Sequence, residues 1–229
     1  SGAMVGAFQP AIANAYGAKD YDRMRSLAFR ACKFGTLLSA VFVLPLALEL
    51  PAVLGIWLKE PPEYAAGLCW CILAVHLVDR TAVGHMLAVA ATGKIAAYQA
   101  FLGGSLILTL PLAWLFARLN WGIYATGWAL ILTMMLCAWG RVWFARTIAG
   151  MSARYWLKRI LLPLLFVFVL VLFAGWLLQL WIDAGLVRIV LSTIVCEMVL
   201  VVLSWLLVLN QGEKELIRDK VLGILHRKR

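Results

Sequence analysis

Charged side chains are scarce in this sequence. Only 14% of its 229 residues are charged and 64% are hydrophobic, whereas soluble domains average about 25% charged and about 45–50% apolar residues. Such an apolar excess excludes an ordinary soluble domain and must face lipid. The formal net charge of +10 does not indicate nucleic-acid binding, because the basic residues lie between apolar runs rather than on one basic face.

Motifs of enzymes and metal sites are also lacking. The sequence has no phosphate-cradling glycine loop, no His-Glu-x-x-His, no nucleophile elbow and no cluster of acidic metal ligands. Its five cysteines show neither a disulfide framework nor zinc-site spacing. We therefore expect no catalysis, no metal and no cofactor.

Long apolar runs dominate the sequence instead. A helix of about 20 apolar residues crosses a hydrocarbon core about 30 Å thick, and six runs are long enough. The segments Leu161–Leu178 and Val187–Leu209 are apolar on every face, unlike the alternating strands of a membrane barrel. The sequence thus predicts an all-α, polytopic membrane helix bundle with six full transmembrane helices, over residues 34–57, 65–91, 95–117, 121–144, 160–181 and 187–209.

The basic residues alternate between the two sides of these spans. Lys and Arg accumulate in cytoplasmic loops, so a cytoplasmic start leaves Lys59, Arg118 and Arg188 outside and Arg80 within a span. This asymmetry predicts a cytoplasmic C-terminus. The 17 other basic residues fall on the cytoplasmic side: Lys19, Arg23, Arg25, Arg30, Lys33, Lys94, Arg141, Arg146, Arg154, Lys158, Arg159, Lys214, Arg218, Lys220, Arg227, Lys228 and Arg229.

Three further segments flank the six-helix bundle of residues 34–209. Residues 1–15 are apolar but too short to span, and we interpret them as the end of a partial N-terminal transmembrane helix in a naturally longer chain. Residues 16–33 predict a cytoplasmic turn and a surface amphipathic helix, since Met24, Leu27, Ala28 and Ala31 share one helical face. Residues 210–229 predict a basic cytoplasmic tail.

Ionisable residues at bilayer depth are functional candidates, because an unpaired charge there is costly. His76, Asp79 and Arg80 are spaced i, i+3 and i+4 and can share one helical face. Arg80 could bind a phosphate or carboxylate through its planar fork of donors, while Asp79 or His76 could accept or release a proton. The alternative is an ion pair that only locks helices together.

The remaining candidates lie apart from this cluster. Glu49 lies between Pro45 and Pro51, near the external end of the first span, and Glu197 is central in the last span. Each could be a proton-binding carboxylate or only an interhelical hydrogen-bonding group. His85 is a weaker candidate. Prolines interrupt the spans at Pro45, Pro51, Pro111 and Pro163, where we expect helix breaks.

Several segments together suggest a family. The segment 10–24, PAIANAYGAKDYDRM, resembles the region after an early helix of polysaccharide and O-antigen flippases, in the superfamily of multidrug, oligosaccharidyl-lipid and polysaccharide exporters. Further similar features follow in order: Ile56-Trp57-Leu58 with Pro61-Pro62 and Tyr64, Gly93-Lys94 with Tyr98, Pro111, and the tail Asn210-Gln211-Gly212-Glu213-Lys214-Glu215.

The resemblance implies the C-terminal lobe of a two-lobed flippase in the bacterial inner membrane, with the N-terminal lobe missing from this chain. It implies export of a lipid-linked oligosaccharide, a polyprenyl-pyrophosphate glycan, by alternating access. Arg80 and His76 would contact the substrate, and Asp79, Glu197 or Glu49 would couple transport to H+ or Na+. An ion-coupled multidrug exporter and a non-transporting membrane scaffold or subunit remain open alternatives.

Overall fold

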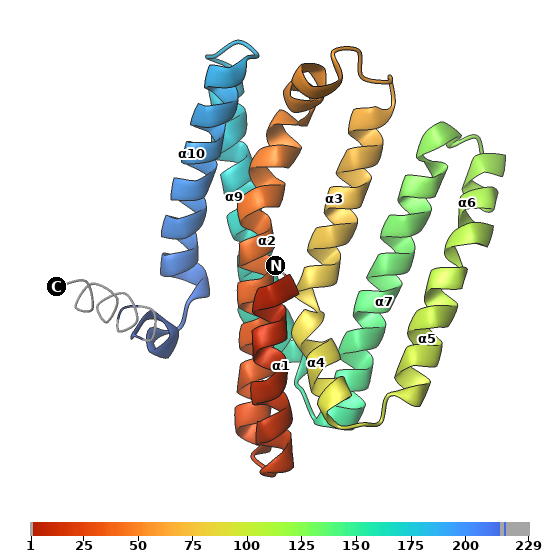
Figure 1. Ribbon diagram of the computed structural model, residues 1–229, viewed down its shortest axis with the longest axis vertical. Helices are drawn as coiled ribbons and strands as arrows, with labels where there is room; N and C mark the ends of the chain where they lie inside the picture. Colours follow the sequence, from red (N-terminus) through yellow and green to blue (C-terminus); the bar gives the residue numbers. More distant parts are fainter. Residues whose placement is uncertain (1, 216–217, 219–229) are drawn as a thin grey trace.

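A computed structural model describes residues 2–215 and 218 of the chain (Figure 1). The described part is helical and contains no strand, which confirms the all-α fold class. Its helices are α1 (Gly2–Gly17), α2 (Tyr21–Leu58), α3 (Ala65–Thr81), α4 (Val83–Ala91), α5 (Ala96–Ile107), α6 (Thr109–Arg118), α7 (Ala125–Ala149), α8 (Ala153–Trp156), α9 (Leu162–Gln179) and α10 (Leu186–Leu203). Short 3-10 or π segments occupy Gly122–Tyr124, Leu157–Leu161 and Ser204–Val208.

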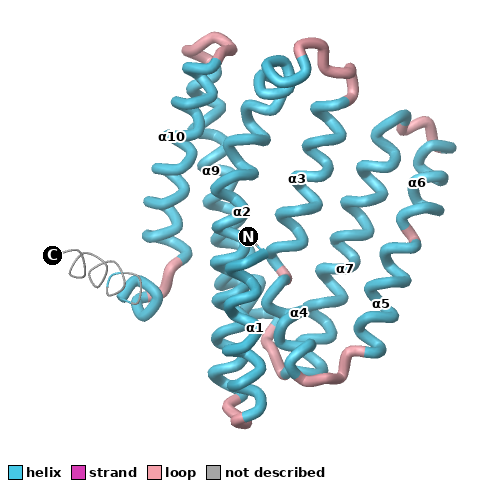
Figure 2. Tube along the Cα trace, in the orientation of Figure 1, coloured by secondary structure: helices cyan, strands magenta, loops and turns pink. Residues whose placement is uncertain are grey.

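These helices form six crossings of the bundle. Five helical segments are long and apolar enough to span a membrane, and the bent pair α3–α4 makes a sixth. The turns at 17–20, 92–95 and 150–152 lie at one end, and the turns at 59–64, 119–121 and 180–185 lie at the other (Figures 1 and 2). Large apolar side chains such as Phe42, Leu110 and Val169 are exposed. The protein is therefore a multi-pass membrane protein whose apolar surface faces lipid.

Helix α2 is the centre of the bundle and packs against α1, α3, α4, α9 and α10. It runs unbroken from Tyr21 to Leu58, with the Asp20 side chain accepting a hydrogen bond from the Arg23 amide at its start. The expected boundary near residue 33 is therefore wrong. Met24, Ala28 and Ala31 are buried in the core with parts of α1 and α4, so this apolar face packs against protein rather than lipid headgroups.

Three prolines of the spans show how a missing backbone N–H is accommodated, whereas α2 continues through Pro45 without a break. Pro51 has no N–H for the Ala47 carbonyl four residues earlier, and the Trp70 indole donates to that oxygen instead, at 2.7 Å. Pro111 likewise cannot bond to Ile107, and the helix is interrupted at Leu108, between α5 and α6. Pro163 lies inside the continuous helical run from Ala153 to Gln179, directly after the π segment Leu157–Leu161, so the helix is locally widened where the proline lacks an N–H.

We expect Trp70→Phe to destabilise the bundle by about 1 to 2 kcal/mol, because it leaves the Ala47 carbonyl without a donor in lipid. Thermal unfolding in detergent micelles measures this change. Trp181→Phe is the matched control, since the Trp181 side chain is 84% exposed and its indole donates no hydrogen bond within the described part of the chain. Equal unfolding midpoints for the two variants would contradict the role given to Trp70.

Candidate functional site

The second span is bent by 44° at Ala82, between α3 and α4. Two side chains from other helices, Trp156 and Cys32, take over backbone groups that the bend frees. The His85 amide donates to the Ala82 carbonyl rather than to the Thr81 carbonyl. The Thr81 carbonyl instead accepts a hydrogen bond from the Trp156 indole at 2.9 Å. The Gly84 amide donates to the sulfur of Cys32 at 3.2 Å. The bend is thus held by α2 and α8 and leaves few polar groups unsatisfied.

Close packing of Gly84 against α2 also fixes the bend. A Cβ atom at Gly84 would collide with the Ala28 carbonyl and the Cys32 sulfur, so only glycine permits this approach of α4 to α2. His85 is fully buried beside Cys32, with the rings of Phe29 and Trp156 edge-on to its imidazole. His85 therefore belongs to the helix packing around the bend.

One turn before the bend lies a cluster of three charges. The Arg141 guanidinium of α7 contacts the Asp79 carboxylate at 2.7 Å and also donates to the Asp79 backbone carbonyl at 3.1 Å. The adjacent Arg80 lies farther away, with its Nε 3.4 Å from the same carboxylate. The side chains of Asp79, Arg80 and Arg141 are 23%, 20% and 11% exposed. Arg141 is therefore the principal partner of Asp79.

This cluster has an excess of one positive charge, since two guanidiniums share one carboxylate. Within the described part of the chain, the Arg80 guanidinium donates no hydrogen bond, and its buried Nε has no acceptor. A guanidinium carries five N–H donors, so Arg80 retains donors for an anion. His76 is half-buried on the same helix as Asp79 and Arg80, and it makes no hydrogen bond or ion pair to any residue that the structure describes.

Glu49 lies in a different environment, at the contact of α2, α9 and α10. Its side chain is 1% exposed, and both carboxylate oxygens accept hydrogen bonds. Arg188 contacts Oε2 through two nitrogens at 3.0 Å, while Ser192 and Gln179 donate to Oε1 at 2.8 and 3.2 Å. This is a completed, neutralised ion pair. Its geometry is that of an interhelical clamp rather than an open ion site.

Glu197 lies on the same helix as Ser192 but has no such partners. It is half-buried, and no described residue makes a hydrogen bond or ion pair to its carboxyl. It lines a groove of about 250 Å³ between α2 and α10 that also contains Pro45, Glu49 and Thr193. Among the carboxyl groups suggested by the sequence, Glu197 is thus the one that is free to bind a cation or proton.

Two ion-pair partners differ from the sequence-based expectation. The charge pattern predicts a cytoplasmic position for Arg141, but this residue lies inside α7 and pairs with Asp79. The same pattern predicts an external position for Arg188, but this residue lies in the first turn of α10 and pairs with Glu49. A signal for Arg141 was present, since Trp139 and Trp143 flank it within the apolar run.

No described group of His, Cys, Asp and Glu side chains could hold a metal ion. Comparisons of the chain with protein-family models, with curated proteins and with solved structures found no match.

Proposed function

We propose that this chain is the C-terminal lobe of a flippase that exports a lipid-linked oligosaccharide across the bacterial inner membrane by alternating access. The resemblance of segment 10–24 and of the later segments supports this family. The six crossings agree in number with those expected of such a lobe. The resemblance implies a second lobe, and transport would be the activity of both lobes together.

The observation that carries this proposal is the Arg80 guanidinium, which shares the Asp79 carboxylate with Arg141 and donates no hydrogen bond in the described part of the chain. It is held at bilayer depth in a cluster with one excess positive charge, where an isolated cation is unfavourable unless an anion or water meets it. A pyrophosphate group offers oxygens that match the planar fork of arginine. Arg80 would hold the pyrophosphate group. Arg141 would occupy the Asp79 carboxylate, so that Asp79 does not neutralise the positive charge of Arg80.

Coupling to H+ or Na+ is assigned to Glu197 and Asp79 in this proposal. The Glu197 carboxyl lines a groove beside Pro45 and has no ionic partner in the described part of the chain. Protonation of Asp79 would release Arg141 and Arg80 together. Glu49 is a weaker candidate, because four donor contacts already surround its carboxylate.

Reconstitution of the full natural protein into liposomes tests this function directly. A fluorescent polyprenyl-pyrophosphate glycan should move between leaflets, as measured by its accessibility to an added quencher or lectin. Flipping should increase with an imposed proton or sodium gradient. Efflux of a cationic drug without glycan movement would favour the multidrug exporter instead, and movement of neither would favour a scaffold or subunit.

We also expect both the turn at 17–20 and residue Arg229 to lie in the cytoplasm, because the basic loops gather at one end of the bundle. A reporter that is active only in the periplasm should stay silent when fused after Arg229. The same reporter inserted in the loop at 59–64, at the opposite end, is the control and should be active. The reverse pattern would overturn this orientation.

A further inference from the structure

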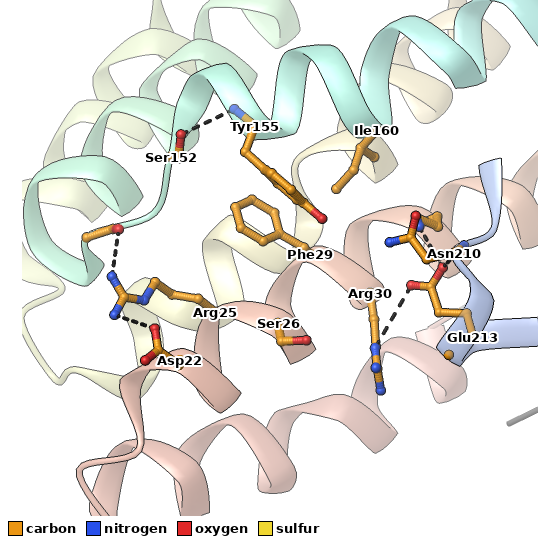
Figure 3. Close-up of a pocket in the computed structure, with 13 residues that line it drawn as sticks. Asp22, Arg25, Ser26, Phe29, Arg30, Ser152, Tyr155, Ile160, Asn210 and Glu213 are labelled. Carbon is orange, nitrogen blue, oxygen red and sulfur yellow. Dashed lines mark hydrogen bonds and ion pairs between the residues drawn. The ribbon is translucent and has the colours of Figure 1, made fainter. Parts of the chain in front are cut away.

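A pocket of about 590 Å³ opens at the end of the bundle that carries the turns at 17–20 and 150–152 (Figure 3). Its walls come from α2, from α8 with the segment after it, and from residues 210–213, which follow the last span. Phe29 and Tyr155 form an aromatic wall, with ring centroids 4.9 Å apart. The pocket is separate from the Asp79 cluster, whose three residues do not line it.

Three cations line the pocket, and they differ in how far their donors are used. Arg25 uses all three of its guanidinium nitrogens, which donate to the Tyr21 and Gly150 carbonyls and to the Asp22 carboxylate. Lys33 is buried, with its ammonium 2.7 Å from Oε2 of Glu213. Arg30 reaches Oε1 of Glu213 only at 3.9 Å, and its side chain is 35% exposed. Arg30 therefore presents unused donors to the pocket.

Glu213 acts as an anion supplied by the chain itself. It comes from the helical segment 211–215, yet its side chain is 6% exposed and reaches back to α2. Its carboxylate accepts from the Asn210 amide at 3.0 Å as well as from Lys33. An ammonium, a guanidinium and a backbone N–H are also the donors that bind phosphate oxygens in proteins. Hydroxyl groups of Ser26, Ser152 and Tyr155 line the same pocket.

We propose that this pocket is a binding site for a phosphate group, which contacts Arg30 and Lys33 and displaces the carboxylate of Glu213 from them. The three lining cations outnumber the carboxylates of Asp22 and Glu213 by one, so an anion is attracted even while Glu213 is in place. A phosphate carries more negative charge and more acceptor oxygens than a carboxylate, which favours the exchange. Glu213 thereby keeps the site closed until the ligand arrives.

Two probes test the proposal on the full chain in detergent micelles. Inorganic phosphate is titrated by calorimetry, and retention of phosphatidylglycerol relative to phosphatidylcholine is counted by native mass spectrometry. Binding of inorganic phosphate indicates a soluble source, and selective retention of phosphatidylglycerol alone indicates a lipid headgroup. Either result supports the site, and the absence of both overturns it.

Variants give effects of opposite sign. Arg30→Gln should weaken binding at least about tenfold without unfolding the protein, because it removes only a 3.9 Å contact. Glu213→Gln should strengthen binding, because it removes the competing charge. Arg23→Gln is the control and should leave phosphate binding unchanged, because Arg23 is an exposed cation on the same helix that lies outside the pocket. Weaker or unchanged binding in a folded Glu213→Gln protein would overturn the displacement, and normal binding by Arg30→Gln would overturn the site.

Discussion

Under the proposed flippase function, Arg80→Ala should abolish glycan export while leaving the abundance of the protein in the membrane near normal. Hydrogen bonds from a guanidinium to a charged group contribute about 1.5 to 3 kcal/mol each, so loss of the Arg80 fork should reduce substrate affinity about 10- to 100-fold or more. Abundance is spared because Asp79 keeps its 2.7 Å contact with Arg141. Arg80→Lys should recover little, since an ammonium lacks the planar fork.

The matched experiments are glycan transfer in a deletion strain and immunoblotting of membranes. Arg118→Ala is the control, because Arg118 is an exposed arginine beside the turn at 119–121, where its guanidinium lies over the Trp114 ring. Arg141→Ala should behave differently from Arg80→Ala and lower abundance, because it removes the principal partner of the Asp79 carboxylate and the donor to the Asp79 backbone carbonyl. Normal export by an Arg80→Leu protein would rule out substrate binding by Arg80.

The spans could be predicted from the sequence because membrane crossing depends on local hydropathy. Each expected run from 34–57 to 187–209 corresponds to a helical crossing, and only the boundaries move. The sharpest bend could not be predicted in the same way. It lies at Ala82 rather than at any proline, because side chains of Cys32 and Trp156, distant in sequence, bind the backbone groups of this turn.

The candidate site was predictable only in part, for a related reason. Helical spacing places His76 and Asp79 near Arg80 on one helix, but it contains no information on neighbouring helices. The pairs Asp79–Arg141, Glu49–Arg188 and Lys33–Glu213 join residues 62, 139 and 180 positions apart. The positive-inside rule treats Arg141, Arg188 and Lys33 as loop residues that report topology. Their pairing with carboxylates becomes visible only in the folded structure.

Glu49→Gln should destabilise the protein by about 3 to 5 kcal/mol, because it leaves the Arg188 guanidinium half-buried without its counterion. Replacing both residues together, Glu49→Leu with Arg188→Leu, should restore most of this loss, since neither charge is then stranded. Thermal unfolding in detergent measures both variants. Glu60→Gln is the control, because Glu60 is an exposed carboxylate in the loop at the same end of the bundle.

The same substitution separates a clamp from an ion-coupling carboxylate. A clamp predicts that Glu49→Gln lowers stability and that the double Leu variant recovers both stability and export. An ion-coupling role predicts that stability barely changes and that export stays lost in both proteins. The first outcome is expected, because the 1% exposed side chain and its four donor contacts leave no open position for a cation.

Glu197→Gln should then abolish the gradient dependence of export without a matching loss of stability, since its carboxyl has no described partner to strand.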